Sequence, residues 1–272
     1  MTDSSIRLAP GVSFLAREVD LLQFGLDATR AGAISVEKAA AVAAALQLHP
    51  RTTTVSQLTG LLVTTGLTPA AAALLVGEFL DFGLWYQPPP PAAVEVVGKS
   101  PLAYSVFGAL KSNGFAVRMR PHPIIEDDPR PIPVFAVDSL YQSHILAANA
   151  HRRQAIIIPV TGFDTRVVLG PLRKNKQGAC PACFNLFRAE IDPRWDKLLQ
   201  ASENHWPELD PLVVTAAQIH VVALARFLTG APLLPGSTPT RWMPGETQEI
   251  DVFGRNLQRF IEPHPRCLFC AG

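Results

Sequence analysis

The sequence has few cysteines and almost no net charge. Among 272 residues there are four cysteines, three methionines and three tyrosines, and 24 Lys and Arg residues are balanced by 23 Asp and Glu. A net charge of +1 argues against a nucleic-acid groove or a membrane-surface role that depends on bulk electrostatics. We therefore expect neither nucleic acid nor a membrane among its partners.

Targeting and membrane-spanning patterns are also missing from the sequence. The first residues, MTDSSIRLAPGVSF, lack a basic region followed by an apolar one. Apolar stretches such as residues 68–86, which Glu78 and Asp81 interrupt, are too short and too polar to span a bilayer. We expect a cytoplasmic protein, in which thiols stay reduced unless a metal holds them.

Four consecutive prolines, residues 88–91, mark the clearest boundary. Such a run cannot lie inside a helix and favours an extended segment. We place a proline-rich linker at residues 88–93, between a first domain at residues 1–87 and a second at residues 94–272.

The first domain has the pattern of a winged-helix-like module. Residues 12–16 and 21–26 are short β-rich runs, and residues 27–36 could turn and add a third strand. Helices are expected at residues 36–48, 55–65 and 68–86. The third helix would begin with Thr68 as its N-cap and Pro69 as its first residue. Its apolar face would consist of Leu74, Leu75, Phe79, Phe82 and Leu84.

The second domain alternates strand and helix, which predicts an α/β fold with a sheet that is parallel in its first part. Strands are expected at residues 92–98, 115–121, 132–139, 155–161 and 165–171, the last two joined by a turn at Gly162. Helices are expected at residues 100–114, 138–154 and 210–230. Residues 240–256 would form a hairpin through Pro244-Gly245, and residues 258–270 a closing strand that leads into the last cysteines.

The four cysteines form two CxxC pairs, Cys180 with Cys183 and Cys267 with Cys270. Both thiolates of a CxxC turn can reach one ion, and two such turns complete a tetrahedral four-cysteine site. We interpret them as a structural Zn²⁺ site that pins the C-terminal segment to the domain. The alternative is two redox-active pairs or four inert thiols. A thioredoxin-type pair would follow a strand and open a helix, and neither pair clearly does so.

Five segments together resemble the ThiF/E1-like superfamily: VEVVGKSPLA (94–103), VDSLYQ (137–142), VVLGPL (167–172), GACPACFNLFRAEIDPRW (178–195) and HPRCLFC (264–270). More narrowly, they resemble actinobacterial leader-peptide-binding proteins of thiazole/oxazole-modified microcin (TOMM) pathways, also called ocin-ThiF-like or cyclodehydratase C-proteins. The resemblance covers most of the chain. It implies a winged-helix RiPP recognition element, the leader-binding module of ribosomal-peptide pathways, followed by a ThiF/E1-like Rossmann-type α/β domain with a four-cysteine zinc site.

The same resemblance exposes a degenerate nucleotide site. Active E1-like enzymes carry a GxGGLG-type loop whose glycines let backbone N–H groups approach phosphates. The matching stretch here is GKSPLA, which keeps Gly98 but has Ser100, Pro101 and Ala103 in place of glycines. The second strand ends with Arg118 and Arg120, where an acid would hold a ribose. Asp138 remains at a magnesium-holding position, whereas Ser139 and Ser143 replace the expected amide and arginine. These departures favour a pseudoenzyme with no catalytic residue of its own.

The leading hypothesis is a scaffold that binds the leader of a precursor peptide and recruits a YcaO-type, ATP-using cyclodehydratase for azoline formation. The peptide would add a strand to the N-terminal ribbon. The candidate contacts are Ala31, Ala33, Leu75, Phe79 and Phe82, of which some must be core residues. The second domain would form a homodimer or dock the partner.

Two alternatives belong to other classes of protein. An active E1-like adenylyltransferase would use Gly98 and Asp138 in an unusual pocket. A winged-helix DNA-binding regulator is disfavoured, because the expected recognition helix at residues 68–86 has no Lys or Arg and carries two acids. The seven histidines form no HExxH motif, and the basic run RKNK (173–176) reads as a solvated turn rather than a phosphate site.

Overall fold

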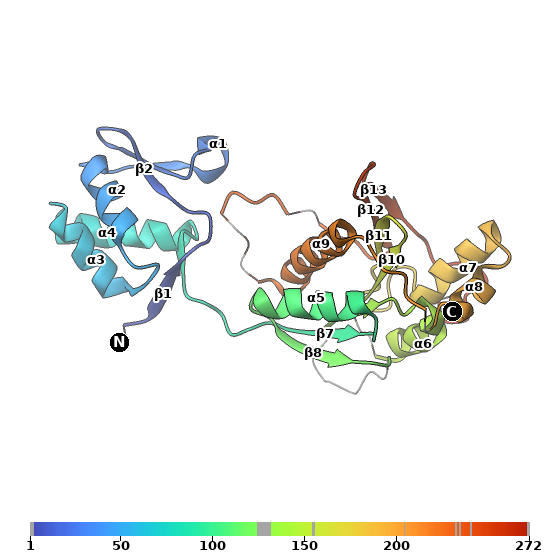
Figure 1. Cartoon of the computed structure of the whole chain (residues 1–272). Helices are drawn as coiled ribbons and strands as arrows, with labels where there is room; N and C mark the ends of the chain where they lie inside the picture. Colours follow the sequence, from blue (N-terminus) through green and yellow to red (C-terminus); the bar gives the residue numbers. More distant parts are fainter. Residues whose placement is uncertain are drawn as a thin grey trace. The chain divides into compact units, whose positions relative to one another are not determined.

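The computed structural model describes residues 3–123, 132–153, 156–203, 205–231, 233, 235–239 and 241–270, with the backbone alone at Ala28, Ala31 and Arg153. The chain divides into two compact units. Unit 1 consists of Met1–Pro90 and Pro232–Pro239, and unit 2 of Pro91–Ala231 and Thr240–Gly272. Each has its own hydrophobic core, and Figure 1 labels the elements of both.

Unit 1, in its described part, combines two small antiparallel sheets with four helices. One sheet has the order β5-β1-β6 and consists of Thr52–Thr54, Ser5–Leu8 and Trp85–Tyr86. The other has the order β2-β3-β4 and consists of Phe14–Glu18, Leu21–Phe24 and Ala33–Ser35. The helices are α1 (Ala28–Ala31), α2 (Ala39–Leu48), α3 (Val55–Thr64) and α4 (Pro69–Asp81).

Much of this arrangement follows the sequence. The ribbon with its third strand and the three expected helices are confirmed, as are the Thr68 cap and Pro69 at the start of α4. The sheet β5-β1-β6 was not expected. Its strands are two to four residues long and come from three distant segments, so no local alternation marks them.

Helix α4 is shorter than the sequence predicts, and Gly83 is the reason. Gly83 has a φ of 66°, and its N–H donates to the Leu80 carbonyl at 3.0 Å. The N–H of Leu84 donates to the carbonyl of Phe79 at 2.9 Å, which completes a Schellman ending. The expected apolar face is therefore wrong in part, because Leu74 and Phe82 are 68% and 61% exposed.

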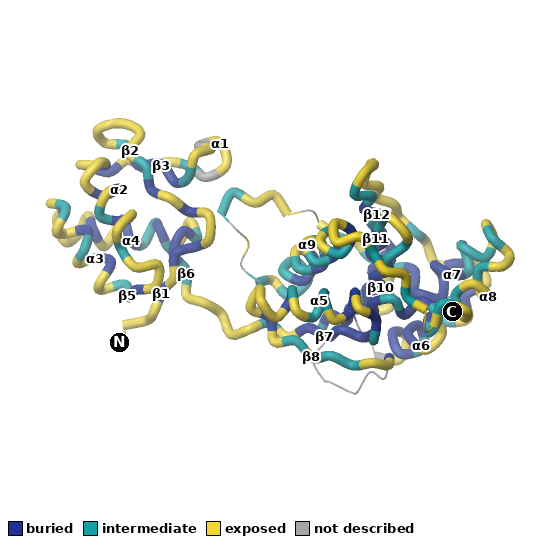
Figure 2. Tube along the Cα trace, viewed as in Figure 1, coloured by how far each residue is buried: buried dark blue, intermediate teal, exposed yellow. Residues whose placement is uncertain are grey.

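Aromatic rings form the centre of unit 1. Phe14, Phe24 and Phe79 are almost fully buried, and their ring centroids lie 5.4–6.1 Å apart. Helix α2 packs Val42 and Leu46 into the same core. Figure 2 shows this buried layer between exposed loops. The core thus ties the β2-β3-β4 sheet to α4.

Unit 2 is built on a seven-stranded sheet with the order β13-β12-β11-β10-β9-β7-β8. The strands are β7 (Ala93–Val97), β8 (Ala116–Arg120), β9 (Pro133–Val137), β10 (Ile156–Phe163), β11 (Arg166–Leu169), β12 (Glu246–Asp251) and β13 (Leu257–Phe260). The four strands β10-β9-β7-β8 are parallel, as expected, and β11, β12 and β13 extend the sheet antiparallel.

Two turns of unit 2 lie elsewhere than the sequence suggests. Gly162 is not a turn residue, because it lies inside β10 opposite Val167, and the chain turns at Asp164-Thr165. The last hairpin does not pass through Pro244-Gly245, which precede β12, but through residues 252–256. In both places strand pairing with neighbours outside the local segment decides the register.

Helices cover both faces of this sheet. The helices are α5 (Pro101–Ser112), α6 (Ser143–Arg153), α7 (Pro181–Ile191), α8 (Trp195–Ala201) and α9 (Pro211–Thr229), with a 3₁₀ turn η1 at Leu140–Gln142. Val94, Val96 and Ile158 point into the core under α5 and α9, which lie side by side (Figure 1). Their neighbours Val97 and Ile157 point to the other face, against Ala150 of α6.

Helix α9 is long and apolar enough to cross a membrane, judged by length and composition alone. Val213, Ala217, Val221 and Leu224 repeat at helical spacing and are buried against the sheet. Gly230, with a φ of 65°, ends the helix as expected. Its pattern is that of a core helix of an α/β unit.

The loop between β7 and α5 leaves no room for a side chain at Gly98. Its φ is 149°, and a Cβ there would overlap the carbonyl oxygen of Val137. We predict that Gly98→Ala destabilises unit 2 by at least about 2 kcal/mol, because strained φ and a backbone clash act together. Thermal unfolding should show a fall in Tm of about 5 °C.

Gly108→Ala is the matched control. A Cβ at Gly108, an exposed position of helix α5, meets nothing within 4 Å. This substitution should leave Tm unchanged or raise it slightly, because Ala favours helix by about 0.5–1 kcal/mol over Gly. Equal changes in Tm for the two substitutions would contradict the close contact between Gly98 and the Val137 carbonyl oxygen.

Candidate metal centre and the edge of the sheet

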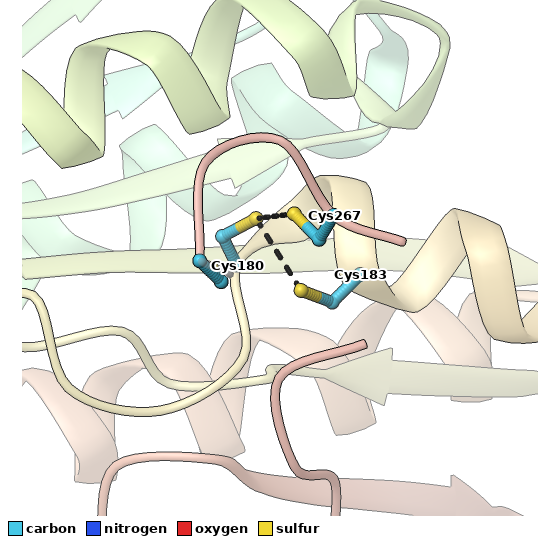
Figure 3. A group of neighbouring side chains, drawn as sticks. Cys180, Cys183 and Cys267 are labelled. Carbon is cyan, nitrogen blue, oxygen red and sulfur yellow. Dashed lines mark hydrogen bonds between the residues drawn. The ribbon is translucent and has the colours of Figure 1, made fainter. Parts of the chain in front are cut away.

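The four cysteines come together from two distant turns. Cys180 is the N-cap residue of α7, where Pro181 is the first helical residue, and Cys183 follows in the first turn. Cys267 and Cys270 lie in the turn after β13, where the N–H of Cys270 donates to the carbonyl of Cys267 at 3.3 Å. Figure 3 shows the Cys180 sulfur pointing toward those of Cys183 and Cys267.

The geometry of the sulfurs fits one bound metal ion. The Sγ of Cys180 lies 3.7 Å from that of Cys183 and 3.6 Å from that of Cys267, and all four ligand atoms lie within 4.8 Å of one another. Tetrahedral metal–sulfur bonds of about 2.3 Å separate sulfurs by about 3.8 Å. A disulfide would need about 2.05 Å. Three of the cysteines are buried, so the cluster is suited to a closed site.

The titration of these thiols supports the same interpretation. Hydrogen bonding to Cys183 and Cys270, together with burial, raises the pKa of the Cys180 thiol. Hydrogen bonds from Cys180 and Cys183, and then the positive charge of Arg173, lower the pKa of Cys270. Without a cation, a protonated Cys180 would lie beside an ionised Cys270. A metal ion would let all four ionise.

Arg173 is a contact of the cluster that sequence reasoning missed. Its side chain is 2% exposed, and Nη1 donates to the Sγ of Cys270 at 3.0 Å and to the carbonyl of Gly178 at 2.5 Å. The interpretation of RKNK as a solvated turn is therefore wrong for Arg173, although Lys176 is exposed. A buried guanidinium offsets part of the negative charge that four thiolates would bring.

His264 fastens the second turn to helix α7. Its backbone N–H donates to the Sγ of Cys183 at 3.3 Å, and its Nδ1 accepts from the N–H of Arg266 at 3.1 Å. Nε2 therefore carries the proton and donates to Oε1 of Glu190 at 3.0 Å. This hydrogen bond lowers the pKa of Glu190. The turn that contains Cys267 and Cys270 is thus attached to α7 by hydrogen bonds of His264 as well as by the sulfurs.

The three candidate residues of the degenerate nucleotide site, Gly98, Ser100 and Asp138, lie together at the carboxyl ends of β7 and β9. Ser100 is fully buried and donates from Oγ to Oδ2 of Asp138 at 2.6 Å. The same Oγ accepts from the N–H of Ala103 at 3.1 Å. Oδ1 of Asp138 accepts from the N–H of Gly162 at 3.0 Å. Burial raises the pKa of Asp138.

This network changes what the helix N-terminus can do. Pro101 has no N–H, and the Ala103 N–H is already bonded to Ser100. Backbone donors at this helix start would bind phosphate in a nucleotide fold. Here the Ser100 side chain bonds one of these donors and Pro101 removes another, so both are unavailable to a phosphate.

The serines that replace the expected amide and arginine also have structural partners. Ser139 donates to the carbonyl of Val137 at 2.9 Å. Ser143 accepts at 2.8 Å from Nδ2 of Asn185 on α7, which also donates to the Leu140 carbonyl at 2.9 Å. Oδ1 of Asn185 accepts from Nε1 of Trp195 at 3.2 Å. One amide thus joins η1, α6, α7 and α8.

A cavity of about 450 Å³ opens beside Asp138. It lies within unit 2, between the start of α5, the ends of β9 and β10, and the segment around α8 and the start of α9. Its lining is mostly apolar and includes Phe163, Trp195, Leu199, Trp206 and Leu209.

The five candidate peptide contacts divide between surface and core. Leu75 and Phe79 are buried in the core of unit 1, so a peptide cannot reach them. Ala33 is exposed on β4, and Phe82 is 61% exposed with its ring 6.4 Å from that of Phe24. The side chain of Ala31 lies outside the described residues. Ala33 and Phe82 are the two that remain at the surface of the described part.

No family model matches the chain, and no curated protein matches its sequence. Solved structures match it. A heterocyclase in complex with substrate and cofactor superposes with a TM-score of 0.65 at 12% identity, and the heterocyclase TruD with 0.57 at 13%. Both matches cover 98% of this chain but 39% and 43% of those chains, so the chain spans about two fifths of their length.

Two matches extend over whole chains. A chain of the E. coli microcin synthetase McbBCD complex with pro-MccB17 bound superposes with a TM-score of 0.56, and E. coli MccB with SeMet MccA with 0.53. Each is 11% identical, and each match covers 98% of this chain and 100% of the other. At these identities the likeness establishes the fold, and at that level the resemblance noted from the sequence is confirmed.

We predict that the purified chain holds one metal ion, and that Cys183→Ser removes it and destabilises unit 2, because three thiolates and a hydroxyl hold an ion far less tightly than four thiolates. Elemental analysis of the purified chain should fall from one metal ion to none, with a fall in Tm. Leu268→Ser, at a 93% exposed position in the other cysteine turn, between Cys267 and Cys270, should change neither quantity. Unchanged metal content in Cys183→Ser would refute the four-sulfur site.

We predict that Arg173→Gln lowers metal affinity by about 10–100-fold while the metal content at saturation stays the same. The substitution removes the positive charge of the guanidinium that donates a hydrogen bond to the Cys270 sulfur. Competition with a chelator measures the affinity. Lys176→Gln, the same change on the exposed side of the turn, is the control and should have no effect.

Proposed function

We propose that this chain is a non-catalytic scaffold that binds the leader peptide of a ribosomally made precursor. It would present that peptide to a YcaO-type, ATP-dependent cyclodehydratase, which forms thiazolines and oxazolines. The solved structures with this fold include a heterocyclase with substrate and a microcin synthetase with pro-MccB17. Their likeness supports the proposal through the fold.

The open edge of β4 is the observation that carries the proposal. In the sheet β2-β3-β4, strand β4 pairs with β3 on one side, and no described strand pairs with its other side. The N–H of Phe24 donates to the carbonyl of Gly32, and that of Val36 to the carbonyl of Asp20. Antiparallel bonding alternates, so Ala33 and Ser35 direct their backbone groups away from β3.

Such an edge accepts an extended peptide as an additional strand. The outward N–H and C=O groups of Ala33 and Ser35 would bond the peptide backbone and set its register. Phe82 would supply an apolar contact beside the ribbon, since its ring lies against Phe24 of β3. We infer that unit 1 is a winged-helix RiPP recognition element in which these residues bind the leader.

Unit 2 would serve this function through its shape rather than through chemistry. Ser100, Pro101 and Asp138 leave no phosphate cradle at the sheet edge. We propose that the thiol cluster holds structural Zn²⁺, because a closed set of four thiolates is typical of zinc. Exposed apolar side chains on α5 and α9, such as Tyr104, Leu212 and Ile219, would contact the cyclodehydratase or a second copy of the chain.

We predict that Ser35→Pro weakens leader binding by about tenfold in the full-length chain. Proline removes the outward N–H of Ser35 and leaves the β3–β4 ladder intact, because that N–H does not bond β3. The measurement is fluorescence anisotropy with labelled leader peptides of the short precursor-like reading frames in the same genome. Ser35→Thr keeps the N–H and should bind like the unchanged protein.

Phe82→Ala provides a second test that does not alter the backbone. Its affinity should also fall by about tenfold, whereas Leu74→Ala, an equally exposed position of α4, should have no effect. Undiminished binding in both Ser35→Pro and Phe82→Ala would rule out strand addition at β4. ATP–pyrophosphate exchange by the chain with peptide would instead favour an adenylyltransferase.

A further inference from the structure

The cavity at the sheet edge has the wrong chemistry for a nucleotide. Its titratable lining residues are Asp138, Asp164, Glu208, Tyr141 and His205, and none of the described lining residues is Lys or Arg. Phosphates need backbone donors or guanidinium and ammonium groups. The carboxylates of Asp164 and Glu208 repel anions, and at the start of the helix Pro101 has no N–H and the Ala103 N–H is bonded to Ser100. An anionic ligand is therefore disfavoured.

The same lining is well suited to a cation with an apolar body. The rings of Phe163, Trp195 and Trp206 line the cavity together with Tyr141, and aromatic faces attract ammonium groups. These rings already contact cations of the protein itself: Nζ of Lys99 lies 5.6 Å from the Trp206 centroid, and Cζ of Arg188 lies 5.8 Å and 5.7 Å from those of Phe163 and Trp195. A ligand cation would use the parts of the rings that line the cavity. Leu140, Leu198, Leu199 and Val214 supply the remaining apolar surface.

One polar group in the lining has no hydrogen-bond partner. Thr161 is 8% exposed, and its Oγ1 is buried without a partner among the described residues. A buried hydroxyl left unsatisfied costs about 1–3 kcal/mol. A ligand N–H donated to this oxygen would remove that cost. Thr161 is thus an independent indication that the cavity receives a hydrogen-bonding group.

Hydrogen bonds within the protein fix the positions of the residues that form the cavity walls. Trp195 donates to Asn185, whose amide also bonds Leu140 and Ser143. On the opposite side, Asp138 is held by Ser100 and Gly162. A volume of about 450 Å³ lies in the range of small-molecule sites.

We propose that this cavity binds a small organic cation, a primary amine on an aromatic or branched apolar body. The aromatic rings and the carboxylates of Asp164 and Glu208 would stabilise the charge, and Thr161 Oγ1 would accept one ammonium N–H. This site is distinct from the peptide edge of unit 1 and does not rest on its function.

Three probes with one ring system and different charge test the proposal. Tryptamine is a cation, 3-methylindole is neutral and indole-3-acetate is an anion. Ligand-observed NMR and calorimetry with the full-length, metal-loaded chain should give the order tryptamine, 3-methylindole, indole-3-acetate. Tryptamine should bind at least about tenfold more tightly than indole-3-acetate. Equal affinities, tighter binding of the anion, or no tryptamine binding at about 5 mM would overturn the proposal.

Substitutions locate the bound amine. Thr161→Val, which keeps the shape, should weaken tryptamine by about three- to tenfold and leave N,N,N-trimethyltryptammonium unchanged, because the quaternary ion has no N–H to donate. Glu208→Gln should weaken both cations, and Glu262→Gln, at an exposed carboxylate outside the cavity lining, should weaken neither. If Thr161→Val affects both cations equally, or Glu262→Gln acts like Glu208→Gln, the assignment of the site is wrong.

Discussion

The four-sulfur cluster is the constraint on which the architecture of unit 2 depends. Cys180 and Cys267 are 87 residues apart in the chain, yet their sulfurs lie 3.6 Å from each other. A metal ion held by all four thiolates would contribute about 10–16 kcal/mol, which is comparable to the whole stability of a typical domain, about 5–15 kcal/mol. Strands β12 and β13 extend the sheet antiparallel, and the cluster joins their far end to the start of α7. The antiparallel half is thereby fixed to the parallel half.

The effect of that constraint reaches the edge of the sheet through α7. Cys183 and Asn185 lie two residues apart on the same helix, so a fixed cluster also fixes the amide of Asn185. That amide determines where Leu140, Ser143 and Trp195 lie. The cavity wall is therefore supported from the cysteine cluster, even though none of the four cysteines lines the cavity.

The sequence predicts what repeats locally and misses what depends on distant partners. The CxxC spacing, the capped helices and the β–α alternation are local patterns, and they identified the cysteine cluster and the parallel strands correctly. Strands β1, β5 and β6 are short and pair across more than forty residues, and the last hairpin takes its register from β11. Arg173 looked like a surface charge because nothing in RKNK indicates burial against Cys270. The cavity could not be predicted, since its lining comes from five separate segments.

The open edge of β4 and the cysteine cluster lie in different units of the chain. The open edge of β4 and Phe82 belong to unit 1, whereas the cysteines and the cavity belong to unit 2, and each unit has its own core. Substitutions that share no partner act additively on stability, so changes at Ala33 or Phe82 should not disturb the cysteine cluster. In unit 2, Ser100 and Asp138 hold the loop at residues 98–103 with internal hydrogen bonds, so this edge of the sheet keeps its shape through its own side chains.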